Sequence, residues 1–163
     1  MSEVRRVRVT LKGVTSPCLE AGAGPEGVLF LHGNPGAAED WRSLVGAAGE
    51  FMAAVAPDMP GFGGADKPAD FNYTIEGYAH HLHGLIEHLQ LQRVHLVLHD
   101  FGGPWGLAYA AARPDKVASV TLINTGVLEG YRWHLMARLW RTPWLGELVM
   151  KATSRFGFTQ VLK

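Results

Sequence analysis

The short apolar run Val28-Leu29-Phe30-Leu31 limits the folds open to this chain more than any other segment. A strand without polar alternation is covered on both faces, as in a sheet that helices flank. The other predicted elements are strands at residues 51–56, 94–98 and 117–123 and helices at 41–50, 75–90 and 103–112. Because strand and helix alternate, we predict an α/β fold with a mostly parallel, doubly wound sheet.

The segment before this run has the pattern of a hairpin. Residues 4–11 largely alternate apolar with charged or polar side chains, which is typical of a half-exposed strand. Residues 15–21 are its expected partner, and Gly22-Ala23-Gly24-Pro25 is a predicted turn. We therefore expect an antiparallel start to an otherwise parallel sheet.

The helix expected at residues 75–90 has a capping residue, Thr74, and an apolar face that repeats every three or four residues from Ile75 onward. It also carries four histidines, His80, His81, His83 and His88. A metal cluster would need further ligands, and neither a cysteine nor a well-placed carboxylate joins them. We expect a solvated face and no metal site.

Composition restricts the partners and the location of the protein. Fifteen basic residues balance fifteen acidic ones, so charge gives no case for binding nucleic acid or an anionic membrane. No stretch approaches the roughly 18 apolar residues of a membrane span. The single cysteine, Cys18, cannot form an internal disulfide and fits a reducing compartment. We expect a soluble, cytoplasmic protein.

The segment His99-Asp100-Phe101-Gly102-Gly103 lies between a predicted strand and a predicted helix. A sharp strand–turn–helix junction of this kind often presents a nucleophile. Glycine after the turn lets the returning helix pass close to the strand, and the positive end of that helix keeps an aspartate ionised. The alternative, purely structural interpretation of Asp100 is a helix cap. We favour the nucleophile.

Four motifs together resemble the α/β-hydrolase family, in its aspartate-nucleophile branch of haloalkane dehalogenases and epoxide hydrolases. They are His32-Gly33-Asn34-Pro35, Ala56-Pro57-Asp58, the loop at residues 61–68 and the segment at 99–103, and the likeness extends over residues 4–125. The resemblance implies that Asp100 attacks a saturated carbon and forms an alkyl ester, which water then hydrolyses. It assigns oxyanion stabilisation to the backbone N–H groups of Asn34 and Phe101.

The resemblance also implies two parts, a hydrolase core at 1–127 and the start of a helical cap at 128–163. In the second part Trp133, Trp140 and Trp144 have the spacing of one helix face, with a break expected near Thr142-Pro143.

Other residues receive roles from the same resemblance. The three tryptophans would form the underside of a lid over an apolar pocket, to which His32 and Trp105 also belong. His32 is expected to be a hydrogen-bonding residue of the oxyanion loop, His99 to point away from the site, and Asp58 to shape a loop. The expected partners are a small apolar electrophile and water, with no cofactor.

The reaction remains open between two chemistries. Leu98, two residues before Asp100, and the Asn34 amide as a possible halide donor favour a dehalogenase. Phe101 lacks the donor that dehalogenases place after the nucleophile. Epoxide opening needs acidic groups, usually two cap tyrosines, and only Tyr131 is present. A non-catalytic protein that binds a ligand or a partner through the same fold is the third possibility.

The family's base histidine follows the last strand, and its acid follows the sixth or seventh. Asn124-Thr125-Gly126 occupies the place after the expected sixth strand, and Glu129 is a remote candidate for the acid. We therefore expect the N-terminal portion of a hydrolase, with the strand at 117–123 as an open edge capable of self-association. Such a chain is expected to be alkylated once without turning over.

Overall fold

The computed structural model describes residues 1–126 and 135–152, which divide into two compact units, Met1–Val127 and Leu128–Lys163. The first unit contains β1 (Arg5–Leu11), β2 (Val14–Ala21), β3 (Glu26–Leu31), the 3₁₀-helix η1 (Ala38–Trp41), α1 (Arg42–Ala48), β4 (Ala53–Pro57), α2 (Ile75–His88), β5 (Arg93–His99), α3 (Gly102–Ala112) and β6 (Val117–Ile123). These elements agree with the predicted alternation of strands and helices.

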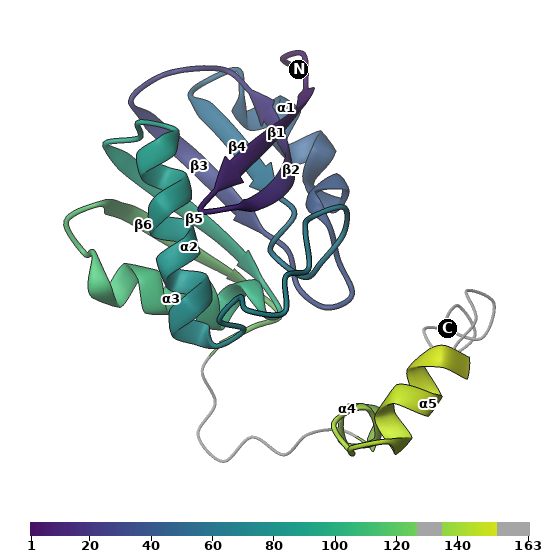
Figure 1. The fold of residues 1–163 in the computed structure, drawn as a ribbon. Helices are drawn as coiled ribbons and strands as arrows, with labels where there is room; N and C mark the ends of the chain where they lie inside the picture. Colours follow the sequence, from purple (N-terminus) through teal and green to yellow (C-terminus); the bar gives the residue numbers. More distant parts are fainter. Residues whose placement is uncertain (127–134, 153–163) are drawn as a thin grey trace. The chain divides into compact units, whose positions relative to one another are not determined.

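The six strands form one sheet in the order β1-β2-β4-β3-β5-β6 (Figure 1). The hairpin β1–β2 and the pair β2–β4 are antiparallel, whereas β3 pairs in parallel with both β4 and β5, and β5 pairs in parallel with β6. The predicted mostly parallel sheet with an antiparallel start is confirmed. Since β3 and β5 are neighbours, the loops that follow them leave the same edge of the sheet side by side.

Two apolar layers cover the sheet, one on each face. On one face α2 and α3 pack against alternate strand residues such as Leu29, Leu31 and Leu98. On the other face η1 and α1 pack against residues such as Val28 and Phe30. The run at 28–31 therefore contributes side chains to both layers, which is why it contains no polar residue.

The helix α2 begins as predicted, because the Thr74 hydroxyl accepts a hydrogen bond from the Gly77 N–H at 3.2 Å. Two expectations for this helix are wrong. Ile75 is 46% exposed rather than part of the apolar face, and His81 is only 8% exposed rather than solvated. The side chain of His81 turns towards the loop before the helix and packs edge-on against Phe71, with ring centroids 5.9 Å apart.

The second unit contains α4 (Leu135–Trp140) and α5 (Leu145–Ala152). The break predicted near Thr142-Pro143 lies between them. Trp140 ends one helix while Trp144 precedes the next, with a φ of +64° and 84% of its surface exposed, so the two tryptophans do not share one helix face. Trp133, Tyr131 and Glu129 lie outside the described residues. Among the helices that the structure describes, none is long and apolar enough to cross a bilayer.

Candidate active site

Asp100 occupies a sharp turn between two regular elements. The strand β5 ends at His99 and the helix α3 begins at Gly102, so only two residues reverse the chain. Asp100 has a φ of +48°, in the left-handed region that aspartate and asparagine enter more readily than most side chains. Its carbonyl oxygen accepts hydrogen bonds from the Gly103 N–H at 3.0 Å and from the Thr125 hydroxyl. These two bonds stabilise the turn from the helix side and from the end of β6.

The two glycines after Phe101 let the helix start close to neighbouring strands. A Cβ atom on Gly102 would lie 2.6 Å from the Leu31 carbonyl oxygen, and one on Gly103 would lie 1.9 Å from the Thr125 hydroxyl oxygen. Contacts this short do not occur with real side chains. Gly102 is therefore required by the close approach of the β3 backbone, and Gly103 by the close approach of the Thr125 side chain.

The loop after β3 brings a backbone donor to the Asp100 carboxylate. The Asn34 N–H donates to Asp100 Oδ1 at 2.8 Å, across a separation of 66 residues. Strand register explains the contact, because Leu31 of β3 pairs with Leu98 of β5 and the two chains then leave the sheet together. Gly33 permits the approach, since a Cβ there would lie 2.3 Å from Asp100 Cβ. The bond links Asp100 to a distant loop, which a purely local helix cap would not do.

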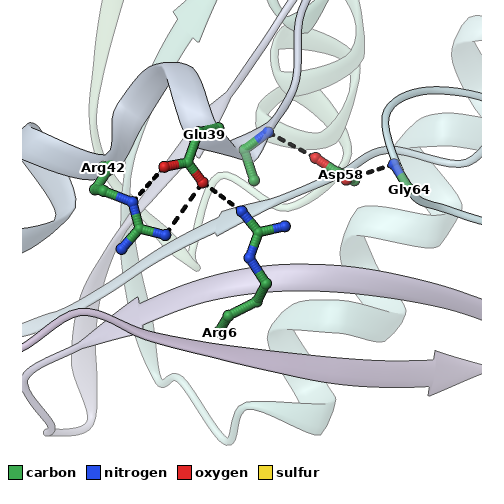
Figure 2. Close-up of polar contacts among 6 residues, drawn as sticks. Arg6, Glu39, Arg42, Asp58 and Gly64 are labelled. Atoms are coloured by element: carbon green, nitrogen blue, oxygen red, sulfur yellow. Dashed lines mark hydrogen bonds and ion pairs between the residues drawn. The ribbon is translucent and has the colours of Figure 1, made fainter.

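A buried carboxylate fixes the position of the Asn34 loop. Asp58 is 4% exposed; its Oδ1 accepts from the Ala38 N–H and its Oδ2 from the Gly64 N–H, each at 2.7 Å (Figure 2). One side chain therefore joins the loop after β3 to the loop after β4. The sequence-based expectation that Asp58 shapes a loop agrees with these contacts.

An exposed group of ion pairs holds η1, which follows the Asn34 loop. Glu39 in η1 contacts both Arg6 of β1 and Arg42 of α1 (Figure 2). The hydrogen bond from Arg42, more than any other contact, lowers the pKa of the Glu39 carboxyl. Because all three side chains are well exposed, water and salt weaken these pairs, and they contribute less than the bonds of Asp58.

His32, in the loop after β3, is a structural residue with both ring nitrogens engaged. Its Nε2 accepts from the Met59 N–H at 3.0 Å, so the proton lies on Nδ1, which donates to the Gly33 carbonyl at 2.9 Å. Burial lowers the pKa of the ring and keeps it neutral. His32 therefore has no free nitrogen with which to act as a base towards Asp100.

Two more residues singled out from the sequence, His99 and Trp105, belong to the first unit. The His99 ring meets Trp41 edge-on at 6.4 Å, on the face that α1 covers. Trp105 is 5% exposed and stacks on Tyr78 at 4.2 Å, with the rings of His32, Phe62 and Phe101 around it. Trp105 thus belongs to a buried group of aromatic rings on the face of the sheet that α2 and α3 cover. Trp140 and Trp144 belong to the second unit.

Two clefts of the first unit have neither Asp100 nor Asn34 in their lining. The larger, of about 630 Å³, lies between the β1–β2 turn and α2, and the smaller, of about 240 Å³, lies between α2 and α3. Within the described ranges no three histidine, cysteine, aspartate or glutamate side chains gather to hold a metal ion.

Replacing Thr125 by valine is expected to lower the free energy of unfolding by about 1 kcal/mol, the usual net value of one hydrogen bond. Valine keeps the shape of threonine but cannot donate to the Asp100 carbonyl. Thr125→Ser, which keeps the hydroxyl, is the matched control, and its free energy of unfolding is expected to fall by less than that of Thr125→Val. Urea unfolding of the three proteins measures the difference, and equal losses for valine and serine would contradict the role of the hydroxyl.

Asp58→Asn is expected to cost about 2 kcal/mol of unfolding free energy, because an asparagine amide would turn its NH₂ towards a buried backbone N–H. One of the two donors, Ala38 or Gly64, would then lack an acceptor. The exposed Asp70→Asn serves as a control that is expected to stay within about 0.5 kcal/mol of the parent. Denaturant midpoints give both values, and similar midpoints for the two variants would show that Asp58 does not hold the loops.

Comparison with known proteins places the chain in a family. Residues 27–155 match the model of the alpha/beta hydrolase fold. The chain belongs to the α/β-hydrolase family. A haloalkane dehalogenase from Mesorhizobium japonicum is 30% identical over 152 residues, which cover 88% of this chain and 48% of that protein. Epoxide hydrolase 2 from Siraitia grosvenorii is 33% identical over 78% of this chain and 40% of its own length.

A solved structure of the same family agrees with the fold. The haloalkane dehalogenase DatA from Agrobacterium tumefaciens C58 superposes with a TM-score of 0.78 and 28% identity, covering 94% of this chain and 54% of its own. The chain therefore spans about half the length of the α/β hydrolases it matches. The resemblance to haloalkane dehalogenases and epoxide hydrolases, inferred from four motifs, is confirmed.

Sequence reasoning missed two supports of the site. Thr125 was expected only to lie at the carboxyl edge of the sheet, and its bond to the Asp100 carbonyl was not foreseen. Gly33 was part of a recognised motif, but the reason for a glycine there is its contact with Asp100, which requires knowledge of the strand order. A hydroxyl residue just beyond β6, the strand that pairs with β5, is the signal that could have indicated Thr125.

Proposed function

We propose that this chain supplies the nucleophile and an oxyanion donor of a hydrolase that displaces a leaving group from a saturated carbon. The observation that carries the proposal is the 2.8 Å hydrogen bond between the Asn34 N–H and the carboxylate of Asp100, at a turn with a φ of +48°. A carboxylate suits attack on tetrahedral carbon, for which no general base has to remove a proton from the nucleophile.

The bond to Asn34 distinguishes the two oxygens of Asp100. Because Oδ1 already accepts from Asn34, Oδ2 is the better nucleophile. Oδ2 forms a bond to the substrate carbon as the bond to the leaving group breaks, and the leaving group departs with the electron pair. Oδ1 then becomes the carbonyl oxygen of the ester. When hydroxide adds to Cγ of that ester, negative charge develops on Oδ1, where the Asn34 N–H is already placed.

Haloalkanes are our first choice of substrate and epoxides the second. A haloalkane dehalogenase from Mesorhizobium japonicum is 30% identical to this chain, and Leu98, the large aliphatic residue two before Asp100, packs against Gly106 of α3. The exposed amide of Asn34 is a candidate halide donor. Epoxide opening remains a candidate because an epoxide hydrolase from Siraitia grosvenorii is similarly close in sequence. A cytoplasmic location is part of the same proposal, and the single buried thiol of Cys18 is compatible with it.

The test is covalent capture by the full chain. The protein is incubated separately with a primary bromoalkane and with a terminal epoxide, and intact mass and peptide mapping then locate any adduct. We expect one alkyl group on Asp100 and, with the bromoalkane, one bromide released for each adduct. Faster capture of the epoxide would favour the second candidate.

The third possibility, a fold that binds without reacting, predicts no adduct with either reagent. An adduct on another residue, such as an exposed histidine, would contradict the assignment of Asp100. Repeated bromide release without an accumulating adduct would show that a histidine of this chain already acts as the hydrolytic base.

A further inference from the structure

The larger cleft of the first unit lies away from the candidate active site. It is bounded by the β1–β2 turn, the loop before α2 and the part of α2 that extends to Gly84. Its volume is about 630 Å³. We call it the β1–α2 cleft. Its strands, β1 and β2, lie at one end of the sheet, separated by β4 and β3 from β5, which Asp100 directly follows. The cleft therefore serves no step of the hydrolase chemistry proposed above.

The inner part of the β1–α2 cleft is apolar except for one imidazole. Leu11, Val14 and Phe71 contribute apolar surface, and His81, only 8% exposed, lies among them. His81 makes ring contact with Phe71 but forms no hydrogen bond within the part of the chain that the structure describes. The imidazole of His81 is thus a polar group in the lining of the cleft that no group of the described chain already bonds, and it can accept from a molecule in the cleft.

The rim of the cleft carries two carboxylates without cationic partners. Asp70 and Glu76 both line it and both are exposed, and neither takes part in an ion pair within the described residues. The ammonium of Lys12, also at the rim, donates to Nε2 of His80 at 2.7 Å. The one ammonium of the rim is thus bonded to an imidazole, while both acids are open to a ligand.

We infer that the β1–α2 cleft binds a small organic ammonium ion with an aromatic or branched aliphatic body. The ammonium group supplies the donors that the neutral His81 ring and the carboxylates of Asp70 and Glu76 can accept. The apolar body covers Leu11, Val14 and the ring of Phe71, whose face also attracts a cation. Lys12 and the positive end of α2 oppose this attraction, so the preference for a cation is modest.

The experiment compares three probes that share a phenyl group and differ in charge. They are 2-phenylethylammonium, 3-phenylpropionate and the neutral 3-phenylpropanamide, each titrated into the full chain at pH 7. The ring resonances of His81 in ¹H–¹³C NMR spectra report occupancy of the cleft. For so small a ligand we expect a dissociation constant on the order of 1 mM. The ammonium should bind about fivefold more tightly than the carboxylate.

Variants separate the cleft from general attraction of cations to the surface. The double substitution Asp70→Asn and Glu76→Gln should weaken binding of 2-phenylethylammonium about tenfold. The matched control is Asp115→Asn, which removes another exposed aspartate without an ion pair and should leave the affinity unchanged. His81→Leu tests the imidazole, with backbone resonances of Phe71 as the reporter, and should also weaken binding.

Three outcomes of these titrations would overturn the inference. Equal or tighter binding of 3-phenylpropionate would assign the cleft to anions through Lys12. If the double variant and Asp115→Asn lose the same affinity for 2-phenylethylammonium, the cation is attracted only by the general surface charge and not by the cleft. An absence of saturable change at His81 with every probe would mean that the cleft holds solvent alone. None of these outcomes depends on the chemistry of Asp100.

Discussion

Replacing Asp100 by asparagine should abolish covalent capture of a haloalkane or an epoxide while leaving the fold intact. Asparagine tolerates the φ of +48° at this turn, and its carbonyl oxygen can still accept from the Asn34 N–H. It lacks a charged oxygen able to attack carbon. We expect the rate of adduct formation to fall by about a thousandfold or more, to the limit of detection.

Thermal unfolding of the same variant provides the control, since its midpoint should lie close to that of the parent chain. Asp100→Ala makes an instructive comparison, because alanine is strained at a positive φ and cannot accept the Asn34 bond. It should lose both capture and stability. If the asparagine variant were alkylated as fast as the parent, Asp100 would not be the nucleophile.

Acid should destabilise the protein through His81. Burial, and after it the neighbouring His80, lowers the pKa of His81 from 6.5 to about 4. The unfolded chain therefore takes up a proton on this residue between about pH 6.5 and pH 4 while the folded chain does not. Stability falls as the pH falls through this window, by about 2 kcal/mol at pH 5 and about 3 kcal/mol at pH 4.

The measurement is urea unfolding of the parent and of His81→Leu from pH 7 to pH 4. Burial also lowers the pKa of His32, so both proteins should lose some stability in acid. The difference between the two free energies isolates His81, and it should shift in favour of the leucine variant as the pH falls. Parallel pH profiles would show that His81 titrates normally and is accessible to solvent.

Much of the fold could be predicted because its signals are local. The cap at Thr74, the apolar run at 28–31 and the Gly102-Gly103 pair each depend on residues within one turn or one strand. The turn at Asp100 belongs to the same group, since a strand, an acid and two glycines in succession are sufficient to indicate it. These features explain why the family could be recognised from four short segments.

Features that depend on distant contacts could not be predicted in the same way. His81 has the polarity of a surface residue, and only the position of Phe71 in the preceding loop shows that it is covered. Trp140 and Trp144 have helical spacing, but Pro143 separates the two helices and removes their common face. The bonds of Asp58 and Thr125 join segments whose proximity follows from the order of strands, which periodicity does not give.

The strand order has a consequence for the time course of folding. The strand β4 follows β3 in the chain and pairs on one side of it, next to β2, whereas β5 pairs on the opposite side of β3, so the chain between β4 and β5 must cross over β3. The bond from Asn34 to Asp100 closes a span of 66 residues and can form only after this long-range pairing. High contact order of this kind slows folding. A ribosome-bound chain can thus assemble the hairpin and β4 early, whereas the contact between Asn34 and Asp100 forms only once β5 has emerged.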